Sequence, residues 1–187
     1  MSIGLDRKIS LKSIITFTLP TMSTMIFLSL YTIVDGVFIS RYVGAEALSA
    51  TNIVYPVINL VLGVSIMMST GGSAIVAMLL GEKREKKARS IFTSLTIVVF
   101  SIGILISIFG NLFIKNIIYL AGSTEELYLY CYDYLATTLY FVPVAILKTY
   151  FDYFLVTAGK PGLGLLSGII GGITNMILDY VFIVPLK

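Results

Sequence analysis

The sequence contains no histidine, and Cys131 is the only cysteine among its 187 residues. Histidine is the commonest metal ligand and the commonest general base in proteins. A lone cysteine cannot form an internal disulfide, and it cannot build a zinc or iron–sulfur site that needs several thiolates. The chain therefore lacks the side chains on which most metal centres and many enzymes depend.

Charge is also scarce in this sequence. Lys, Arg, Asp and Glu make up 12% of it, whereas soluble domains typically carry about 25%. The net charge of +3 comes from 13 basic and 10 acidic residues, which is too sparse for a nucleic-acid-binding surface. Hydrophobic residues account for 57%, and the mean hydropathy is +0.97. These values exclude an ordinary water-soluble enzyme, and they predict a protein that crosses a membrane several times.

Five apolar segments are long enough to be membrane spans, since a spanning helix needs roughly 20 mostly apolar residues. Glycine-containing turns separate the segments. We expect helices over residues 14–40, 45–80, 88–119, 125–158 and 163–185. This pattern predicts an all-α, polytopic transmembrane helix bundle with five spans over residues 1–187 and no soluble domain. The first apolar run is too long for a cleaved signal peptide.

The basic residues predict the orientation of the chain, because cytoplasmic loops are enriched in Lys and Arg. Most of the 13 lie before the first helix, after the second or after the fourth: Arg7, Lys8, Lys12, Lys83, Arg84, Lys86, Lys87, Arg89 and Lys160. We therefore expect a cytoplasmic N-terminus and, after five spans, a C-terminus outside. Tyrosines near the outer ends of the third and fourth helices would form an interfacial belt: Tyr119, Tyr128, Tyr130, Tyr132 and Tyr134.

Four charged residues fall inside the predicted spans, where an unpaired charge costs several kcal/mol. Lys148 and Asp152 are four residues apart, so they lie on one face of a helix and can neutralise each other. One interpretation is a structural ion pair. The alternative is a polar cavity that contains Asp152, with Lys148 setting the proton affinity of its carboxylate.

Asp35 and Asp179 have no such partner within their own helices. Asp179 lies one turn after Asn175, and both continue the face of Ser167 and Gly171 at four-residue spacing. Both carboxylates are expected in the outer half of the membrane at comparable depth. They either accept hydrogen bonds that lock helix packing, or they form a shared site for a proton or a small cation such as sodium.

Two backbone features complete the analysis of single residues. Pro20 removes a hydrogen bond inside the first helix, which predicts either a static kink or a hinge. Gly164, Gly168 and Gly172 form a small-residue stripe on the fifth helix, and such a stripe permits close helix approach.

Several motifs, in order along the chain, resemble those of multidrug and toxic compound extrusion (MATE) transporters. Leu19-Pro20 is followed by the segment LYTIVDGVFI at 30–39, then by GA at 44–45, ALSA at 47–50, Pro56, GGS at 71–73 and Gly81. The clearest match is NMILDYVFI at 175–183, which is similar to the family pattern N-x-x-x-D-x-x-F-I. One feature departs from many relatives, which carry an arginine near the end of the fourth helix, whereas residues 156–159 read VTAG.

The resemblance implies a fold of twelve helices in two six-helix bundles. The chain would cover helices one to five, an incomplete N-terminal lobe whose partner would be the C-terminal lobe. It implies antiport in the cell membrane: drugs or organic cations leave while protons or sodium ions enter. Asp35, Asn175 and Asp179 would form the cation site, and Pro20 would be the bend of the first helix. No catalytic residue, no other cofactor and no nucleic-acid partner is implied.

Two alternatives remain at this stage. A lipid-linked oligosaccharide flippase of the same superfamily would share the topology, and it would need a cationic cavity for which Lys148 is the main candidate. An intramembrane aspartyl protease would also use two membrane aspartates. Its reaction needs a G-x-G-D setting, and neither Val34-Asp35-Gly36 nor Leu178-Asp179-Tyr180 supplies one.

Overall fold

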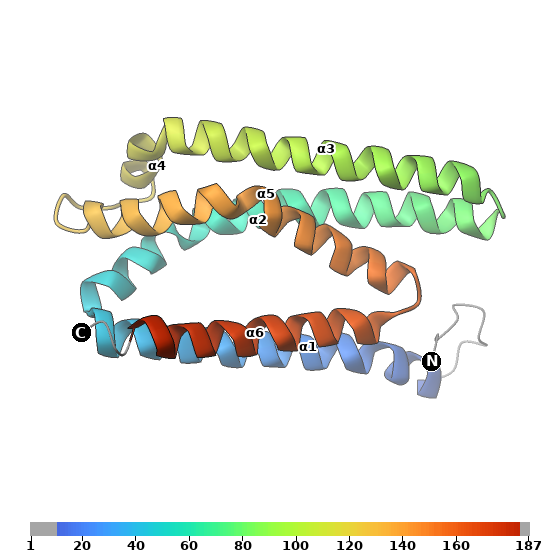
Figure 1. Cartoon of the computed structure of the whole chain (residues 1–187), viewed down its shortest axis with the longest axis horizontal. Helices are drawn as coiled ribbons and strands as arrows, with labels where there is room; N and C mark the ends of the chain where they lie inside the picture. Colours follow the sequence, from blue (N-terminus) through green and yellow to red (C-terminus); the bar gives the residue numbers. More distant parts are fainter. Residues whose placement is uncertain (1–10, 184–187) are drawn as a thin grey trace. The chain divides into compact units, whose positions relative to one another are not determined.

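The computed structural model describes residues 11–183, which form helices and turns and contain no strand. The helices are α1 (Leu11–Phe38), the π-helix η1 (Ile39–Val43), α2 (Ala45–Gly81), α3 (Glu85–Leu112), α4 (Ile114–Leu120), α5 (Tyr128–Thr157) and α6 (Pro161–Ile183), as Figure 1 shows. Within these residues, five stretches are long and apolar enough to cross a membrane: Met25–Val43, α2, α3, α5 and α6. The predicted all-α fold with five spans is confirmed.

The chain divides into two units. The first unit contains residues 1–45 and 155–187, and the second contains residues 46–154. The first unit therefore holds α1, η1 and α6, whereas the second holds nearly all of α2 and α5 together with α3 and α4. We describe each unit by itself.

The helices α2, α4 and α5 end with the same pattern of backbone hydrogen bonds, the Schellman motif. At the end of α5, the Lys160 N–H donates to the Leu155 carbonyl oxygen at 2.9 Å, and Gly159 has a φ of 70°. Gly122 has a φ of 96° after α4. This left-handed conformation favours glycine because a side chain would be strained there. The turn after α2 differs, since the residue with the left-handed backbone is Lys83, at φ 60°.

The helix predicted over residues 88–119 is wrong in one respect, because it is not continuous. α3 ends at Leu112, Phe113 leaves the helical region at φ −105° and ψ 17°, and α4 begins at Ile114. The change of direction lets Ile114 and Ile118 of α4 be buried in the core. Burial of these two side chains favours the break over a longer straight helix.

The other predicted boundaries differ less from the structure. The predicted helix 14–40 corresponds to α1 followed by η1, and the predicted helix 45–80 corresponds to α2. The α5 helix begins at Tyr128 instead of residue 125, and α6 begins at Pro161 instead of 163. The predicted end at residue 185 lies outside the described residues.

The core of the second unit lies where α2, α3 and α5 meet, and α4 closes one end of it. Its largest fully buried side chains include Tyr150, Ile118, Leu135, Leu139 and Ile146. The Tyr150 hydroxyl donates a hydrogen bond to the Phe92 carbonyl oxygen of α3 at 3.2 Å. Because the buried hydroxyl has a partner, the tyrosine can be accommodated among apolar side chains.

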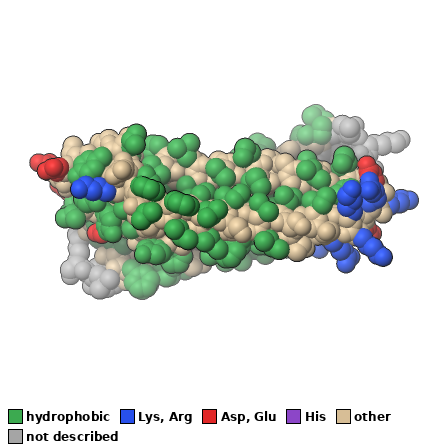
Figure 2. Space-filling model, turned by 90° about the horizontal axis from the view of Figure 1, so that it is seen from above, with side chains coloured by type: hydrophobic (Ala, Val, Ile, Leu, Met, Phe, Trp, Pro, Cys, Tyr) green, Lys and Arg blue, Asp and Glu red, His purple; other side chains and the backbone are tan. Residues whose placement is uncertain are grey.

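Apolar side chains also cover much of the outer surface, as expected for helices that face lipid. Figure 2 shows hydrophobic side chains along most of one face, with most of the visible Lys and Arg side chains gathered at one end. The basic residues of the α2–α3 turn and of the start of α3 are exposed: Lys83, Arg84, Lys86, Lys87 and Arg89. Tyr119 stacks on Tyr128 with ring centroids 5.5 Å apart, so two of the tyrosines predicted to form an interfacial belt lie together.

Candidate cation site

The candidate site lies in the first unit, where α1 and α6 pack side by side and run in the same direction (Figure 1). The contact faces are made of residues at helical spacing. On α1 they are Phe27, Tyr31 and Asp35, and on α6 they include Gly172 and Asp179. Residues spaced by three, four, seven or eight positions share one face of a helix. The site is therefore built by two faces that meet along their length.

The two carboxylates that the sequence predicted to share a site, Asp35 and Asp179, lie on the two helices that pack together, α1 and α6. Asp35 and Asp179 are both partly buried, and they are close enough for their charges to interact. The exposed hydroxyls of Ser29 and Thr32 on α1 donate to the Met25 and Leu28 carbonyl oxygens of their own helix. Two like charges at one helix interface repel each other unless a proton or cation lies between them.

Two oxygen atoms on α6 complete the candidate site. Asn175 Oδ1 and Asp179 Oδ2 are buried, and neither has a hydrogen-bond partner among the described residues. Buried polar atoms in folded proteins almost always have a partner. Carboxylate and amide oxygens are also the ligands that hard cations prefer. The chemistry of these oxygens therefore suits a proton or a sodium ion.

Two glycines of the predicted small-residue stripe are buried in α6. Ser167 is only partly buried and Gly171 is exposed, whereas Gly168 and Gly172 are buried. Of the residues that the sequence groups on one face with Asn175 and Asp179, Gly171 is therefore exposed, and the buried glycines are those of the small-residue stripe. At Gly172 the aromatic rings of Phe27 and Tyr31 on α1 lie against a residue that has no side chain.

The Lys148–Asp152 pair lies in the second unit, on α5. Lys148 Nζ and Asp152 Oδ2 are 2.6 Å apart, and their side chains are 52% and 29% exposed. The four-residue spacing thus brings the two charges together as predicted. The pair is accessible rather than buried in the core, so the ammonium and the carboxylate neutralise each other at the edge of the unit.

Pro20 lies within α1, which continues on both sides of it. The side chain of Pro20 lies outside the described part of the structure, so the choice between kink and hinge stays a prediction.

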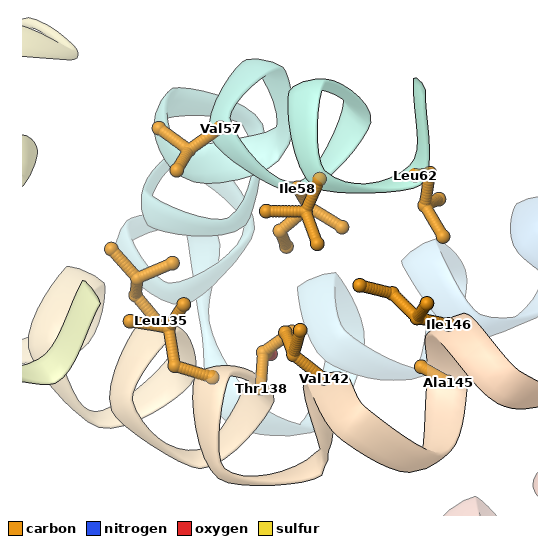
Figure 3. A pocket seen from close by; sticks show the side chains of 10 residues that line it. Val57, Ile58, Leu62, Leu135, Thr138, Val142, Ala145 and Ile146 are labelled. Carbon is orange, nitrogen blue, oxygen red and sulfur yellow. The ribbon is translucent and has the colours of Figure 1, made fainter. Parts of the chain in front are cut away.

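A small apolar cavity lies between α2 and α5 in the second unit (Figure 3). Its volume is about 40 Å³, and ten residues line it. Thr138 is the one polar residue among them, and its hydroxyl donates to the Tyr134 carbonyl oxygen of the same helix at 2.8 Å. Sites for drug-sized molecules measure about 300–1,000 Å³, so this cavity is too small for such a ligand.

The model of the MatE family matches residues 20–181 of the chain. The chain belongs to the MatE family. The match includes Asp35, Asn175 and Asp179, so all three candidate site residues lie inside the region that defines membership. The resemblance inferred from the sequence motifs is confirmed.

Curated relatives of this MatE chain are bacterial proteins of greater length. The probable multidrug resistance protein YoeA of Bacillus subtilis (strain 168) is 21% identical over 167 residues, which are 89% of this chain and 36% of the relative. The multidrug export protein MepA of Staphylococcus haemolyticus (strain JCSC1435) is 25% identical over 177 residues, 92% of this chain and 38% of that protein. The MatE chain therefore spans less than two fifths of these relatives.

Two solved structures share the fold of this MatE chain with a TM-score of 0.86 and 22% sequence identity. One is an outward-facing multidrug resistance MATE family transporter of the MOP superfamily. The other is a MOP superfamily transporter from Pyrococcus furiosus, in which a reversed polarity of the binding pocket suggests a different function. The match covers 94% of this chain and 39% of each structure.

One contact at the site was not predicted, namely the packing of Phe27 against Gly172. A signal for it was present in the sequence, because Phe27, Tyr31 and Asp35 follow one another at four-residue spacing. Spacing within one helix, however, does not identify the residue that faces it on another helix.

Proposed function

We propose that this chain forms the first five spans of a secondary active exporter that expels drugs or organic cations in exchange for protons or sodium ions. The observation that carries the proposal is that two partly buried carboxylates, Asp35 and Asp179, lie one on each of the packed helices α1 and α6, with buried oxygens of Asn175 and Asp179 that have no hydrogen-bond partner among the described residues. Membership of the MatE family and the curated relatives, which are named as multidrug export and resistance proteins, support it.

The proposed coupling mechanism begins with the electrostatics of this pair. When the site is empty of cations, the carboxylates of Asp35 and Asp179 repel each other across the α1–α6 interface. Binding of a proton or sodium ion removes that repulsion and satisfies the free oxygens of Asn175 and Asp179. Filling the site therefore favours a different packing of α1 on α6.

Export requires that the cation and the drug prefer opposite states of the transporter. Such a transporter alternates between inward-open and outward-open states, with its sites near the bilayer midplane. If the cation stabilises the state from which the drug is released, the ion gradient drives the drug outwards. The proposal also includes a drug cavity, a C-terminal lobe as the partner of this chain, and a location in the cell membrane.

We also propose that the N-terminus and the α2–α3 turn face the cytoplasm. The exposed cluster Lys83, Arg84, Lys86, Lys87 and Arg89 supports this orientation, because positive charge is retained on the cytoplasmic side.

Export of drugs is favoured over the flipping of lipid-linked oligosaccharides by the state of Lys148. A flippase would use cationic side chains to hold the phosphate groups of its substrate. Lys148 is instead paired with Asp152 at 2.6 Å, so its charge is already neutralised.

The proposal is tested by removing the charge of each carboxylate while keeping the shape of the side chain. The assay uses a protein of the same length as the relatives, with this chain as its N-terminal part. In that protein, Asp35→Asn or Asp179→Asn is expected to abolish gradient-driven efflux of a fluorescent cationic dye. Asp133→Asn is the matched control, because Asp133 lies exposed on α5 in the second unit. Membrane abundance of each variant is measured on the same cells.

Efflux near the parental rate in either Asp35→Asn or Asp179→Asn would remove that residue from the coupling site. Equal loss in Asp133→Asn would show that the assay responds to any lost carboxylate. Repeating the assay in vesicles with a sodium gradient alone, or a proton gradient alone, identifies the coupling ion.

A further inference from the structure

Gly172 of α6 lies directly against two aromatic rings of α1. A β-carbon placed on Gly172 would lie 2.5 Å from Cε1 of Phe27 and 3.1 Å from Cδ1 of Tyr31. Carbon atoms in favourable contact stay about 3.5–4.0 Å apart. Position 172 therefore accepts no side chain while the ring of Phe27 keeps its place.

This contact and the carboxylate pair lie on the same faces of the two helices. On α6, Asn175 and Asp179 follow Gly172 by three and seven residues, and on α1, Asp35 follows Phe27 by eight. At 1.5 Å per residue, both carboxylates lie about 10–12 Å beyond the contact. Because α1 and α6 run in the same direction (Figure 1), the register at Gly172 determines which residues meet at the site.

We infer that Gly172 is a positioning residue of the cation site. Its missing side chain lets the Phe27 ring rest on the backbone of α6, and this contact holds Asp35 beside Asp179. The role of Asp35 and Asp179 in cation coupling rests on the proposed function, whereas the packing of Phe27 on Gly172 does not depend on it. An alanine at position 172 displaces the ring, changes the approach of α1 to α6 and separates the carboxylates.

Other glycines of α6 supply matched controls. Gly171 is the neighbouring residue, and a β-carbon there would meet no atom within 4 Å. The same holds for Gly164. Gly171→Ala and Gly164→Ala thus introduce the same methyl group into the same helix without touching the Phe27 ring.

The first experiment measures the proximity of the two helices and needs no transport. Cys131 is the only cysteine of the chain and is fully buried, so Cys131→Ala gives a background free of native thiols in this chain. In that background, Asp35→Cys combined with Asp179→Cys is expected to cross-link in isolated membranes when a copper–phenanthroline oxidant is added. Gly172→Ala should slow the cross-link several-fold, whereas Gly171→Ala should leave its rate unchanged.

The second experiment measures the cation dependence of dye efflux. It uses the protein of the relatives' length that has this chain as its N-terminal part. Gly172→Ala should raise several-fold the cation concentration that gives half-maximal efflux, and Gly171→Ala should not. Phe27→Leu removes the ring atoms that would collide with the new methyl group. Adding it to Gly172→Ala should restore both the cross-linking rate and the cation dependence towards parental values.

Unchanged cross-linking and unchanged cation dependence in Gly172→Ala would overturn the inference. So would a defect that Phe27→Leu fails to rescue, because that outcome indicates a general loss of folding. If the parental protein shows no cation-dependent efflux, the proposed function fails, but the cross-linking rates still decide the role of Gly172.

Discussion

The hydroxyl of Ser65 on α2 donates a hydrogen bond to the carbonyl oxygen of Ile146 on α5, with a distance of 3.0 Å. Ser65 is almost fully buried, and its own carbonyl oxygen accepts a hydrogen bond from the Ser69 hydroxyl at 2.6 Å. A short chain of polar groups thus joins two apolar helices inside the second unit. Small hydroxyl residues are common at such contacts because they allow close helix approach.

Ser65→Ala is expected to lower the free energy of unfolding by about 1 kcal/mol, since it removes one interhelical hydrogen bond. Ser73→Ala is the matched control, because the Ser73 hydroxyl donates to the Thr70 carbonyl oxygen of its own helix, at 3.1 Å. Thermal unfolding of both purified variants in detergent makes the comparison. Equal destabilisation by the two substitutions would show that the link to Ile146 contributes nothing of its own.

Gly103→Ala is expected to be the more damaging of two glycine substitutions in the second unit. A β-carbon at Gly103 would lie 2.8 Å from the Cα of Pro143, and a backbone atom cannot rotate away. Overpacking of this kind costs about 1–3 kcal/mol. At Gly63 a β-carbon would meet no atom within 4 Å, so Gly63→Ala should stabilise α2 by up to about 1 kcal/mol. The melting temperatures should therefore move in opposite directions.

The ion pair on α5 is tested by a double-mutant cycle. Lys148→Met leaves the Asp152 carboxylate without its partner, and Asp152→Leu leaves the ammonium of Lys148 without its partner. Each single change should reduce the yield of folded protein in membranes, and the double change should recover much of the loss. Strictly additive losses would mean that the two charges act independently despite their contact. Lys148→Met should affect efflux less than Asp35→Asn.

The orientation is tested with a membrane-impermeant thiol reagent in the Cys131→Ala background. Lys86→Cys, in the first turn of α3, should react only when the reagent reaches the cytoplasmic face. Glu125→Cys, in the turn before α5, should react in intact cells. Both positions are exposed, so accessibility does not limit either reaction. The reverse pattern would place the N-terminus outside.

The hinge prediction for Pro20 depends on its distance from the site. Asp35 lies fifteen residues beyond Pro20, about 22 Å along α1, so a bend at one point can be transmitted to the other. Pro20→Ala restores the missing backbone donor. A hinge predicts reduced efflux per folded molecule with the melting temperature unchanged or raised. Lowered stability with unchanged turnover would identify a static kink instead.

The sequence by itself determined the number of spans and the family. Both depend on local properties: a spanning helix is recognised by its length and hydropathy, and the motif around Asp179 is read within nine residues. The closeness of Lys148 and Asp152 was also predictable, because one helix turn fixes it.

Only the tertiary structure decided which faces of the helices meet. In soluble proteins hydrophobic periodicity reveals the buried face, but the surfaces of a membrane helix are apolar whether they face lipid or protein. For that reason the sequence did not show which residues of α1 would lie against the small-residue stripe of α6. The break at Phe113 has a similar origin, because it depends on the burial of Ile114 and Ile118 against helices distant in the sequence. The sequence also did not show the register in which α1 and α6 pack, in which Phe27 lies against Gly172.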